Sequence, residues 1–417
     1  MARPVRILQL VPEPLPTFRA DVATLFGKYL PRHGVQCHLV GKGSAAPADN
    51  QGFASSRRAR AGARWKSELS FLWLCLRALL GANGRTHDAV QVRDMVSIGL
   101  LALLVARMKG LPMMYWLSYL MSEGRIERAQ GELARLPARR ILRRLRARLV
   151  LAKGCAERWL LYRVLLPRAD HVFVQSEAMA RLVARHGVPA GRISAVPMGV
   201  DMEAVAPAGS VPTARSWPGW EGRAVVAYLG TLDRARCLER VLDALVLVRR
   251  ELPSARLLLI GSSPQQADVP QLLDAARARG LAEAVQVTGW LPPAQAWEYL
   301  QGAQAAISYV PRGALYDVSS PTKLLEYLAL GMPCVGNDIP DQEAVLAASG
   351  AGWLAASTPQ AMADALLAIL RDPQAARERA AAGPAYIEAA RSYRVLGEAV
   401  AQRYRNLVGG DHAGRIA

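Results

Sequence analysis

Short apolar runs alternate with amphipathic stretches through the first half of the chain. Residues 5–11 and 35–40 are apolar enough for buried strands, and residues 20–32 between them have a helical period that ends at Gly34. Residues 89–94, 112–119, 168–177 and 193–197 give further strands, and residues 96–108 a helix. This alternation predicts a parallel, doubly wound sheet that binds ligands beyond the carboxyl ends of its strands.

The second half repeats this pattern after a stretch rich in Pro, Gly, Ser and Trp. Residues 224–229, 257–261, 285–288, 305–310 and 333–337 read as buried strands, with helical segments between them. We therefore predict a first domain at 1–204, a linker at 205–222, a second domain at 223–390 and a final helix and tail at 391–417. Residues 44–66, polar and then arginine-rich, are expected to form a mobile basic loop.

The stretch 319–333 carries the strongest chemical signal. Ser319 or Ser320 is placed to cap a helix whose first turn contains Pro321, and Gly331 and Pro333 end it. The N–H groups at such a helix start bind anions, and Ser319, Ser320 and Thr322 would line this spot. Lys323 opposes the helix dipole unless an anion lies between them. Glu326, one turn further on the same face, is placed to accept hydrogen bonds from paired hydroxyls such as those of a ribose.

A second turn in the same half offers matching cations. Residues 230–236 follow a buried strand as Gly-Thr-Leu-Asp-Arg-Ala-Arg, so that Gly230 and Thr231 form the turn and Arg234 and Arg236 enter the next element. An arginine can take two phosphate oxygens at once. Gly289 and Trp290 follow another strand, where the indole would flank a nucleotide base or simply pack in a loop.

These motifs together resemble the donor site of GT-B glycosyltransferases of the family 4 type. In that family a Ser/Pro/Lys run leads into a Glu-containing helix that holds the nucleotide diphosphate and the ribose. Residues 197–201, Pro-Met-Gly-Val-Asp, resemble the family's Pro-Asn-Gly-Val-Asp. Two departures concern the donor: Thr231 replaces an arginine, and Val318, next to Asp317, replaces a glutamate that contacts the donor sugar.

The resemblance implies two Rossmann-like α/β domains that face each other across a cleft, with a C-terminal helix that crosses back to the first domain. It implies Arg236, Lys323 and Glu326 as catalytic residues, and donor contacts from the residues named above at 230–234, 289–290 and 317–322. On the acceptor side the family's paired glycines and histidine are missing, and Thr17, Arg19, Ser118 and Glu123 stand near those places. Transfer with retention of configuration is implied, and inversion using Glu123, Asp94 or another base stays open.

The distribution of charge along the chain points to a further binding partner. Residues 1–207 hold 32 lysines and arginines against 14 acidic residues, whereas the remainder has 20 against 20, so the first half carries the whole net charge of +18 (32 − 14). The densest part, residues 125–168, sets arginines beside apolar positions, which suits an anionic membrane surface as well as a solvated face. Aromatic residues do not alternate with the basic ones, which disfavours nucleic acid. The apolar stretches 69–82 and 96–108 are too short to span a bilayer, and residues 1–4 lead directly into a strand without a signal-peptide core.

The sequence therefore predicts a metal-independent hexosyltransferase that takes a nucleotide-sugar as its donor and needs no cofactor. The five cysteines show no metal-binding spacing, and there is no Asp-x-Asp pair. The expected acceptor is a polyprenyl-diphosphate-linked saccharide of surface polysaccharide synthesis, at the cytoplasmic face of the membrane. Two alternatives stay open: an epimerase-like nucleotide-sugar enzyme of the same fold, and a non-catalytic basic protein that binds lipid or nucleic acid.

Overall fold

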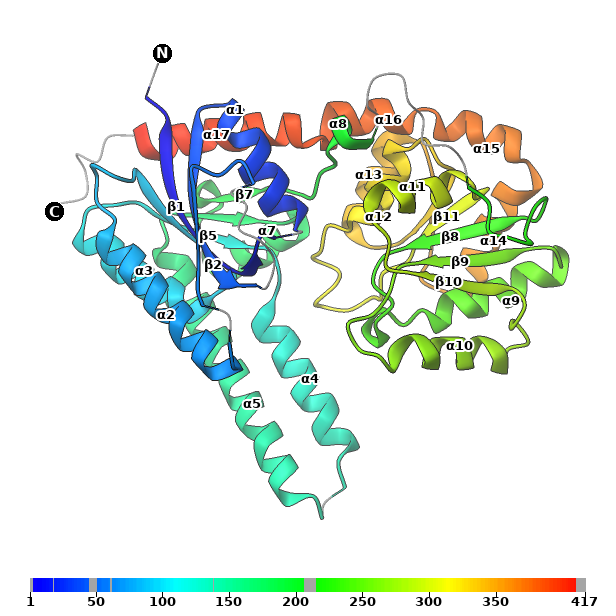
Figure 1. Ribbon diagram of the computed structural model, residues 1–417, viewed down its shortest axis with the longest axis horizontal. Helices are drawn as coiled ribbons and strands as arrows, with labels where there is room; N and C mark the ends of the chain where they lie inside the picture. The colour runs from blue at the N-terminus through cyan, green and yellow to red at the C-terminus, as the bar shows by residue number, and fades with distance from the viewer. Residues whose placement is uncertain are drawn as a thin grey trace. The chain divides into compact units, whose positions relative to one another are not determined.

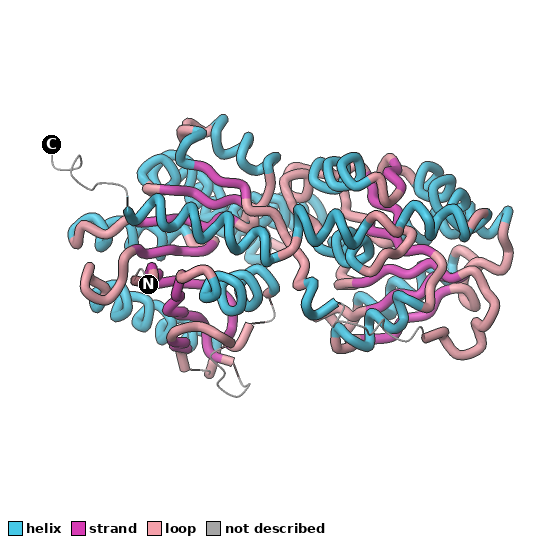
Figure 2. Tube along the Cα trace, turned by 90° about the horizontal axis from the view of Figure 1, so that it is seen from above, coloured by secondary structure: helices cyan, strands magenta, loops and turns pink. Residues whose placement is uncertain are grey.

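The computed structural model describes residues 3–17, 19–44, 51–60, 62–137, 139–205 and 215–409. The chain divides into two compact units (Figure 1). Unit 1 contains Met1–Pro197 and Tyr393–Ala417, and unit 2 contains Met198–Ser392. Each unit is built on its own parallel sheet with helices along both faces, which Figure 2 shows from above. The predicted pair of doubly wound Rossmann-like domains is confirmed.

The sheet of unit 1 has seven strands among the described residues, in the order β3-β2-β1-β4-β5-β6-β7. All the pairings between neighbouring strands are parallel. The strands are β1 (Val5–Leu15), β2 (Val35–Gly43), β3 (Ser55–Arg58), β4 (Ala89–Arg93), β5 (Met113–Leu117), β6 (His171–Val174) and β7 (Ile193–Ala195). The central strands β4, β5 and β6 are buried along their whole length, as a sheet covered on both faces requires.

The helical segments of unit 1 cover this sheet and include one long excursion. They are η1 (Asp21–Tyr29), α1 (Leu30–Arg32), α2 (Arg64–Gly81), α3 (Val96–Met108), α4 (Met121–Arg135), α5 (Ile141–Leu160), η2 (Leu161–Leu165), α6 (Leu166–Arg168), α7 (Glu177–Arg185) and η3 (Ala190–Arg192). The helices α4 and α5 pack against each other as a hairpin that extends away from the sheet (Figure 1). The basic stretch predicted at 125–168 is thus largely helical.

The last helix, α17 (Tyr393–Gly409), belongs to unit 1 although the preceding residues belong to unit 2. Its buried residues Leu396, Val400 and Tyr404 join the apolar core formed by η1 and the central strands. The Tyr404 hydroxyl donates a hydrogen bond of 2.5 Å to Oε1 of Gln91 in β4. The predicted return of the C-terminal helix to the first domain is therefore confirmed.

The sheet of unit 2 has six parallel strands among the described residues, in the order β10-β9-β8-β11-β12-β13. The strands are β8 (Val225–Leu229), β9 (Arg256–Ile260), β10 (Val285–Gly289), β11 (Ala305–Ser308), β12 (Cys334–Asn337) and β13 (Trp353–Ala355). The helical segments are α8 (Met202–Val205), η4 (Arg234–Arg236), α9 (Glu239–Glu251), α10 (Asp268–Ala278), α11 (Pro293–Gln301), α12 (Thr322–Ala329), α13 (Pro340–Ser349), α14 (Pro359–Arg371), α15 (Pro373–Ala380), α16 (Gly383–Tyr386) and η5 (Ile387–Arg391).

Two details differ from the sequence-based expectations. The stretch 44–66, expected as a loop, contains β3, which pairs with β2 at the edge of the sheet. An edge strand leaves much of its surface to solvent, so the polar residues 55–58 form one without an apolar pattern. The unit boundary falls at Met198 and not at 204, because Val200, Val205 and Trp220 pack into the core of unit 2. The middle of the predicted linker, 206–214, lies outside the described residues.

Candidate functional site

Three strands of unit 2 end in glycines that let their backbones come close together. Gly230 and Gly261 follow β8 and β9 with φ of +143° and +146°, and Gly289 ends β10 with φ of +78°. A Cβ on Gly261 would lie 2.0 Å from the carbonyl oxygen of Gly230, so only glycine fits there. The strand ends therefore present backbone rather than side chains at this edge of the sheet.

Lys323 lies over this glycine edge. A Cβ on Gly230 would lie 2.4 Å from Lys323 Cε and 3.2 Å from its Nζ. The ammonium is also 5.3 Å from the ring centroid of Tyr228, which supports it as a cation–π partner. Helix α12 is held in place by Tyr327, whose hydroxyl accepts a hydrogen bond of 2.9 Å from the backbone N–H of Leu229. The lysine thus lies beside Tyr228 and Gly230, and Tyr327 separately ties its helix to β8.

The start of α12 has no side-chain cap, so the predicted serine cap is wrong. The N-cap residue is Pro321. The Ser319 hydroxyl donates to the carbonyl of Tyr316 at 2.6 Å. The Ser320 hydroxyl donates to Asp341 at 2.6 Å and accepts from the N–H of Met198 at 3.0 Å. Both hydroxyls therefore form hydrogen bonds that hold the loop before α12. Among the described residues, the first N–H groups of α12, at Thr322 and Lys323, have no side-chain acceptor.

Burial and nearby charge shift the titration of the two key groups on α12. Burial and the Arg236 guanidinium lower the pKa of Lys323 to about 8. Burial raises the pKa of Glu326 to about 7, although Lys323 and a hydrogen bond from Trp297 oppose the rise. No carboxylate lies within 4 Å of the Lys323 ammonium in the described part of the chain. The two cations raise the local positive potential, which favours an anion beside them.

Arg236 is the second cation of this group. Its guanidinium is 5.9 Å from the ring centroid of Tyr316, and its Nε is 3.9 Å from a carboxylate oxygen of Asp233. The Nε atom is buried and has no hydrogen-bond partner among the described residues. A buried donor without a partner is costly, so this atom is poised to bind an acceptor. Arg236 is close enough to Lys323 to lower the pKa of the lysine, so the structure brings the two predicted cations together.

Asp317 is tied to its own loop. Its carboxylate accepts hydrogen bonds of 2.8 and 3.2 Å from Arg312 and one of 3.2 Å from the N–H of Gly313. Although burial acts in the opposite direction, Arg312 and this N–H lower the pKa of Asp317. Arg312 also forms an ion pair of 3.0 Å with Asp338 after β12. Asp317, which the sequence analysis offered as a donor contact, therefore fixes the loop before α12.

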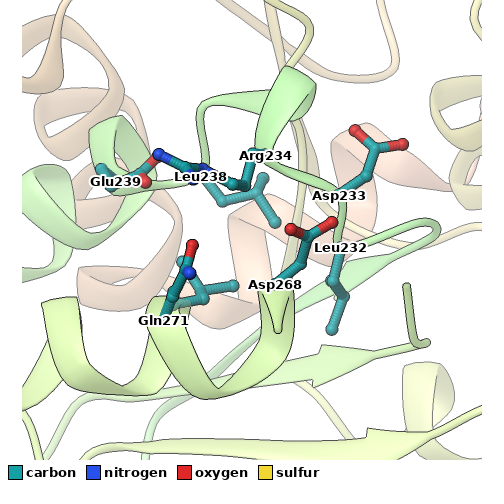
Figure 3. Close-up of a pocket in the computed structure, with 8 residues that line it drawn as sticks. Leu232, Asp233, Arg234, Leu238, Glu239, Asp268 and Gln271 are labelled. Carbon is teal, nitrogen blue, oxygen red and sulfur yellow. The ribbon is translucent and has the colours of Figure 1, made fainter. Parts of the chain in front are cut away.

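The remaining donor-side predictions are spread around the glycine edge. Arg234 is exposed and lines a pocket of about 220 Å³ between the 232–239 turn and the start of α10 (Figure 3). Asp233, Glu239 and Asp268 also line it, so this pocket is acidic and suits neutral or cationic groups better than a diphosphate. Trp290 is 72% exposed and free of the core. The carbonyl of Thr231 accepts a long hydrogen bond, 3.5 Å, from Tyr228.

Unit 1 contains a buried charge cluster at the carboxyl edge of its own sheet, centred on Arg93. Arg93 is fully buried, and its Nη2 donates to Asp21 at 2.6 Å and to Ser118 at 2.7 Å. Its Nε donates to Glu13 at 3.1 Å. Asp94, with φ of +53°, accepts from the N–H of Ser118 at 2.7 Å and from the Ser118 hydroxyl. Arg93 thus pairs with three carboxylates, Glu13 from β1, Asp21 from η1 and Asp94 directly after β4, and Arg19 pairs with the first two as well.

Protonation in this cluster follows from the balance of burial and the arginine charges. Burial raises the pKa of Glu13 and of Asp94, although Arg93 acts against it in both cases. Burial would also raise the pKa of Asp21, but Arg93 and Arg19 together lower it. Two buried atoms have no partner in the described residues, Oε2 of Glu13 and Nη1 of Arg93. The cluster therefore has one acceptor atom and one donor atom that are available to another group.

Two of the acceptor-side predictions join this cluster directly. Arg19 donates to Asp21 at 3.2 Å, and Ser118 bridges Arg93 and Asp94 as described. Thr17 adjoins them through its hydroxyl, which accepts from the N–H of Arg19 at 3.1 Å. Glu123 is held elsewhere, in the first turn of α4, where it accepts a hydrogen bond of 2.7 Å from Ser122. Sequence reasoning missed Glu13, Asp21 and Arg93, although the Arg93-Asp94 pair at the end of β4 was an available signal.

Comparisons with known proteins agree with this architecture. A family model described as glycosyltransferase family 4 matches residues 21–204, and one described as glycosyl transferases group 1 matches residues 223–372. The fold of the two units is that of the GT-B glycosyltransferases. The chain is a GT-B glycosyltransferase. No curated protein matches the sequence significantly.

Solved structures share the fold at low sequence identity. Anabaena Alr3699/HepE in complex with UDP and glucose is 14% identical, with a TM-score of 0.67 over 96% of this chain and 99% of that one. Sucrose-phosphate synthase from Thermosynechococcus elongatus is 17% identical, with a TM-score of 0.69 over 98% and 100%. WaaG, a glycosyltransferase involved in lipopolysaccharide biosynthesis, is 12% identical, with a TM-score of 0.64 over 98% and 100%.

Proposed function

We propose that this enzyme transfers a hexose from a nucleotide-diphosphate sugar, and that the diphosphate binds at the start of α12 between Lys323 and Arg236. The observation that carries the proposal is the pairing of these two cations beside an uncapped helix N-terminus. An anion there would satisfy the first N–H groups of α12, the buried Nε of Arg236 and the Lys323 ammonium at once. The two cations repel each other until it binds.

The same groups would then assist the chemistry. As the glycosidic bond to the leaving diphosphate breaks, negative charge grows on the phosphate oxygen, and Lys323, Arg236 and the helix N–H groups are fixed where that charge develops. They need little reorganisation because Gly230, Tyr228 and Tyr327 already hold the lysine and its helix. Glu326, one turn along α12, would accept hydrogen bonds from the ribose hydroxyls. UDP and UDP-glucose complexes of HepE support a donor of this class.

Metal independence and retention of configuration remain part of the proposal. Lys323 and Arg236 would supply the positive charge that a divalent ion supplies in other transferases. In a retaining transfer, the leaving phosphate oxygen takes the proton of the acceptor hydroxyl while that hydroxyl bonds to the anomeric carbon on the same face. The anomeric coupling constant of the product in a proton NMR spectrum tests this step: an inverted anomer would require a separate base.

For the acceptor, we propose a polyprenyl-diphosphate-linked saccharide at the cytoplasmic face of the membrane, in surface polysaccharide synthesis. No helix in the described ranges is long and apolar enough to cross a membrane. In unit 1, α2 packs beside α3, and α3 beside α5. These three helices expose large apolar side chains at Trp65, Leu69, Leu72, Trp73, Leu80, Leu104, Met108, Ile141, Leu142, Leu145, Leu149 and Trp159. We call these side chains, together with the basic residues on the same helices, the apolar–basic face.

Basic residues accompany the apolar ones on these helices. Arg143, Arg144, Arg146 and Arg148 lie on α5, and its acidic residue, Glu157, is paired with Arg125 of α4. Exposed tryptophan and leucine beside arginine fit the boundary between headgroups and acyl chains of an anionic bilayer. WaaG, which shares the fold, is involved in lipopolysaccharide biosynthesis and supports an acceptor of this class. The apolar–basic face is thus proposed to hold the enzyme next to a lipid-linked acceptor.

Calorimetric titration of UDP, GDP, ADP and CMP tests the donor site. We expect one nucleoside diphosphate to bind the wild type, and Lys323→Ala and Arg236→Ala each to weaken it roughly 10- to 100-fold, the loss of one charge-assisted contact. Glu326→Ala should weaken it less, because only the ribose contact is lost. Arg250→Ala removes an exposed arginine in the last turn of α9 and serves as the control. Wild-type affinity in both the Lys323 and Arg236 variants would rule out the clamp.

A further inference from the structure

One face of the unit 1 sheet is polar at the edge where α2 covers it. The register pairs Arg6 with Gln36, and His38 with Ser55, and the next strand position on this face is Arg57 opposite Val40. Because side chains alternate along a strand, these residues point to the same side. A parallel sheet covered by a helix normally buries apolar residues on that side. Here Gln36 and Arg57 are exposed and Arg6, His38 and Ser55 are only partly buried, so this polar set lies at an open edge of the sheet and not in the apolar core.

A cavity of about 530 Å³ lies between this face and the second half of α2. Its sheet side includes Leu8, His38, Val40 and Arg57, and its other walls come from Arg77 and Ala78 of α2 and from the turn 85–87 before β4. This volume is within the range that holds small-molecule ligands. Arg6 and His87 border the cavity near the beginnings of β1 and β4, so it lies away from the carboxyl edge that carries the Arg93 cluster.

The lining is strongly cationic. Arg6, Arg57, Arg77 and Arg85 contribute guanidinium groups, and none of the described residues that line the cavity is a carboxylate. Arg6 is paired with Asp88. The guanidinium groups of Arg57, Arg77 and Arg85 have no carboxylate within 4 Å in the part of the chain that the structure describes. Positive charge therefore gathers at this cavity, and Asp88, which is paired with Arg6, offsets only part of it.

Two histidines, His38 and His87, complete the wall of the cavity. The rings of His38 and His87 meet edge to face with centroids 4.9 Å apart. Each uses its Nδ1 locally: His38 with the Ser55 hydroxyl and His87 with the Thr86 hydroxyl, both at 2.9 Å. Burial, His38 and Arg57 lower the pKa of His87 to about 4, although Asp88 acts against them. Burial is the first cause and involves no charge, but the contribution of Arg57 to the pKa of both histidines places its guanidinium near the two rings.

We propose that this cavity is a second ligand site, distinct from the donor site of unit 2, and that it binds a phosphate group carried on a less polar body. The arginine forks of Arg57 and Arg77 match the several oxygens of a phosphate. Leu8, Val40 and Ala78 offer apolar surface to the remainder of the ligand. Such a ligand is either a soluble phosphate ester or the headgroup of a lipid, since both present the same phosphate chemistry.

Binding of three soluble probes tests the site: inorganic phosphate, glucose 1-phosphate and dihexanoyl phosphatidic acid below its micelle concentration. We expect calorimetry to detect at least one of them, and Arg57→Ala/Arg77→Ala to weaken it at least tenfold. Arg58→Ala is the matched control, because Arg58 is the neighbouring arginine on β3 and points to the other face of the sheet. Thermal unfolding without ligand verifies that all variants fold.

The outcomes separate the possible explanations. Tighter binding of the phospholipid than of the two other probes identifies a lipid headgroup, and the reverse order identifies a soluble ester; both support the site. Lys323→Ala should bind the probe as the wild type does, whereas a loss in that variant would mean that the probe occupies the donor site. That loss, equal effects of Arg58→Ala and the double variant, or no binding of any probe would overturn the proposal. The proposed donor site is tested separately, by nucleotide binding to the Lys323 and Arg236 variants.

Discussion

The Cε atom of Lys323 lies so close to the backbone of Gly230 that a Cβ on residue 230 would be 2.4 Å from it. Gly230 also has φ of +143°, which side-chain-bearing residues rarely adopt. The backbone of residue 230 therefore favours glycine, and a Cβ there would also displace the end of the Lys323 side chain from α12. The two residues are far apart in the sequence, and their contact sets the position of the ammonium group at the proposed diphosphate site.

Gly230→Ala should displace Lys323 and reduce transferase activity. The new Cβ would push the lysine off the glycine edge, and we expect kcat/KM to fall roughly 100-fold, similar to the loss of one well-placed donor. Gly280→Ala is the control: Gly280 also has a positive φ, of +71°, but open space around its Cβ position. The control should lose about 1 kcal/mol of stability and keep its activity. Equal activity in Gly230→Ala and the wild type would contradict the assigned position of Lys323.

Affinity for the nucleoside diphosphate should be greatest between about pH 7 and pH 8. Below pH 7 Glu326 is protonated and accepts fewer hydrogen bonds from the ribose, because its pKa is raised to about 7. Above pH 8 the free protein loses the Lys323 charge, because its pKa is lowered to about 8. Calorimetry across this range checks both limbs. Lys323→Arg should remove the loss of affinity above pH 8, and Glu326→Gln should reduce the loss of affinity below pH 7. An unchanged pH dependence in both variants would contradict the assignment of these two groups.

Stability should also change with pH through Glu326. Its pKa is raised from 4.5 in the unfolded chain to about 7 in the folded one, so the folded state binds the proton more tightly. This contribution to stability is complete below pH 4.5 and is lost as the pH rises through 7. Wild-type Tm should therefore fall more between pH 5 and pH 7.5 than the Tm of Glu326→Gln. An identical fall in both proteins would mean that Glu326 titrates normally.

Membrane binding should depend on the apolar–basic face. Trp73 is 61% exposed on α2 and Leu149 is 64% exposed on α5. Removing either apolar contact with Trp73→Asp or Leu149→Asp should weaken binding to anionic vesicles roughly tenfold in flotation assays, since burying such a side chain contributes about 1.5–3 kcal/mol. Leu354→Asp, at a leucine 46% exposed on β13 of unit 2, is the control. High salt should also weaken the binding of the wild type to anionic vesicles. Vesicle binding that survives both substitutions would remove this face from the proposal.

Arg93→Met should destabilise unit 1 strongly. It leaves Glu13, Asp21 and Asp94 buried without their common partner, and breaking a buried ion pair on one side costs about 3–5 kcal/mol. Thermal unfolding gives the change in stability, with Arg146→Met on α5 as a control for loss of an arginine outside the cluster. If Arg93→Met unfolds at the wild-type temperature, the carboxylates must be protonated and the cluster carries less charge than its geometry indicates.

The order of apolar and amphipathic stretches was enough to predict both parallel sheets, and the resemblance to GT-B enzymes added the return of the last helix to the first domain. Strand and helix periods depend on neighbours in sequence, and the spacing of Lys323 and Glu326 places them on one helical face whatever the rest of the chain does. Their use for a nucleotide-sugar stays a prediction that the binding experiments decide.

Tertiary contacts decided the rest, because they join residues that no local pattern links. Ser320 would cap α12 if only its neighbours mattered, but Asp341 and Met198 take its hydroxyl, and this leaves the helix start open. Likewise Glu13, Asp21 and Arg93 come from three separate elements, and their meeting follows only from the strand order β1-β4-β5. The same is true of the cationic cavity beneath α2, whose arginines are scattered along the chain until the sheet brings them to one face.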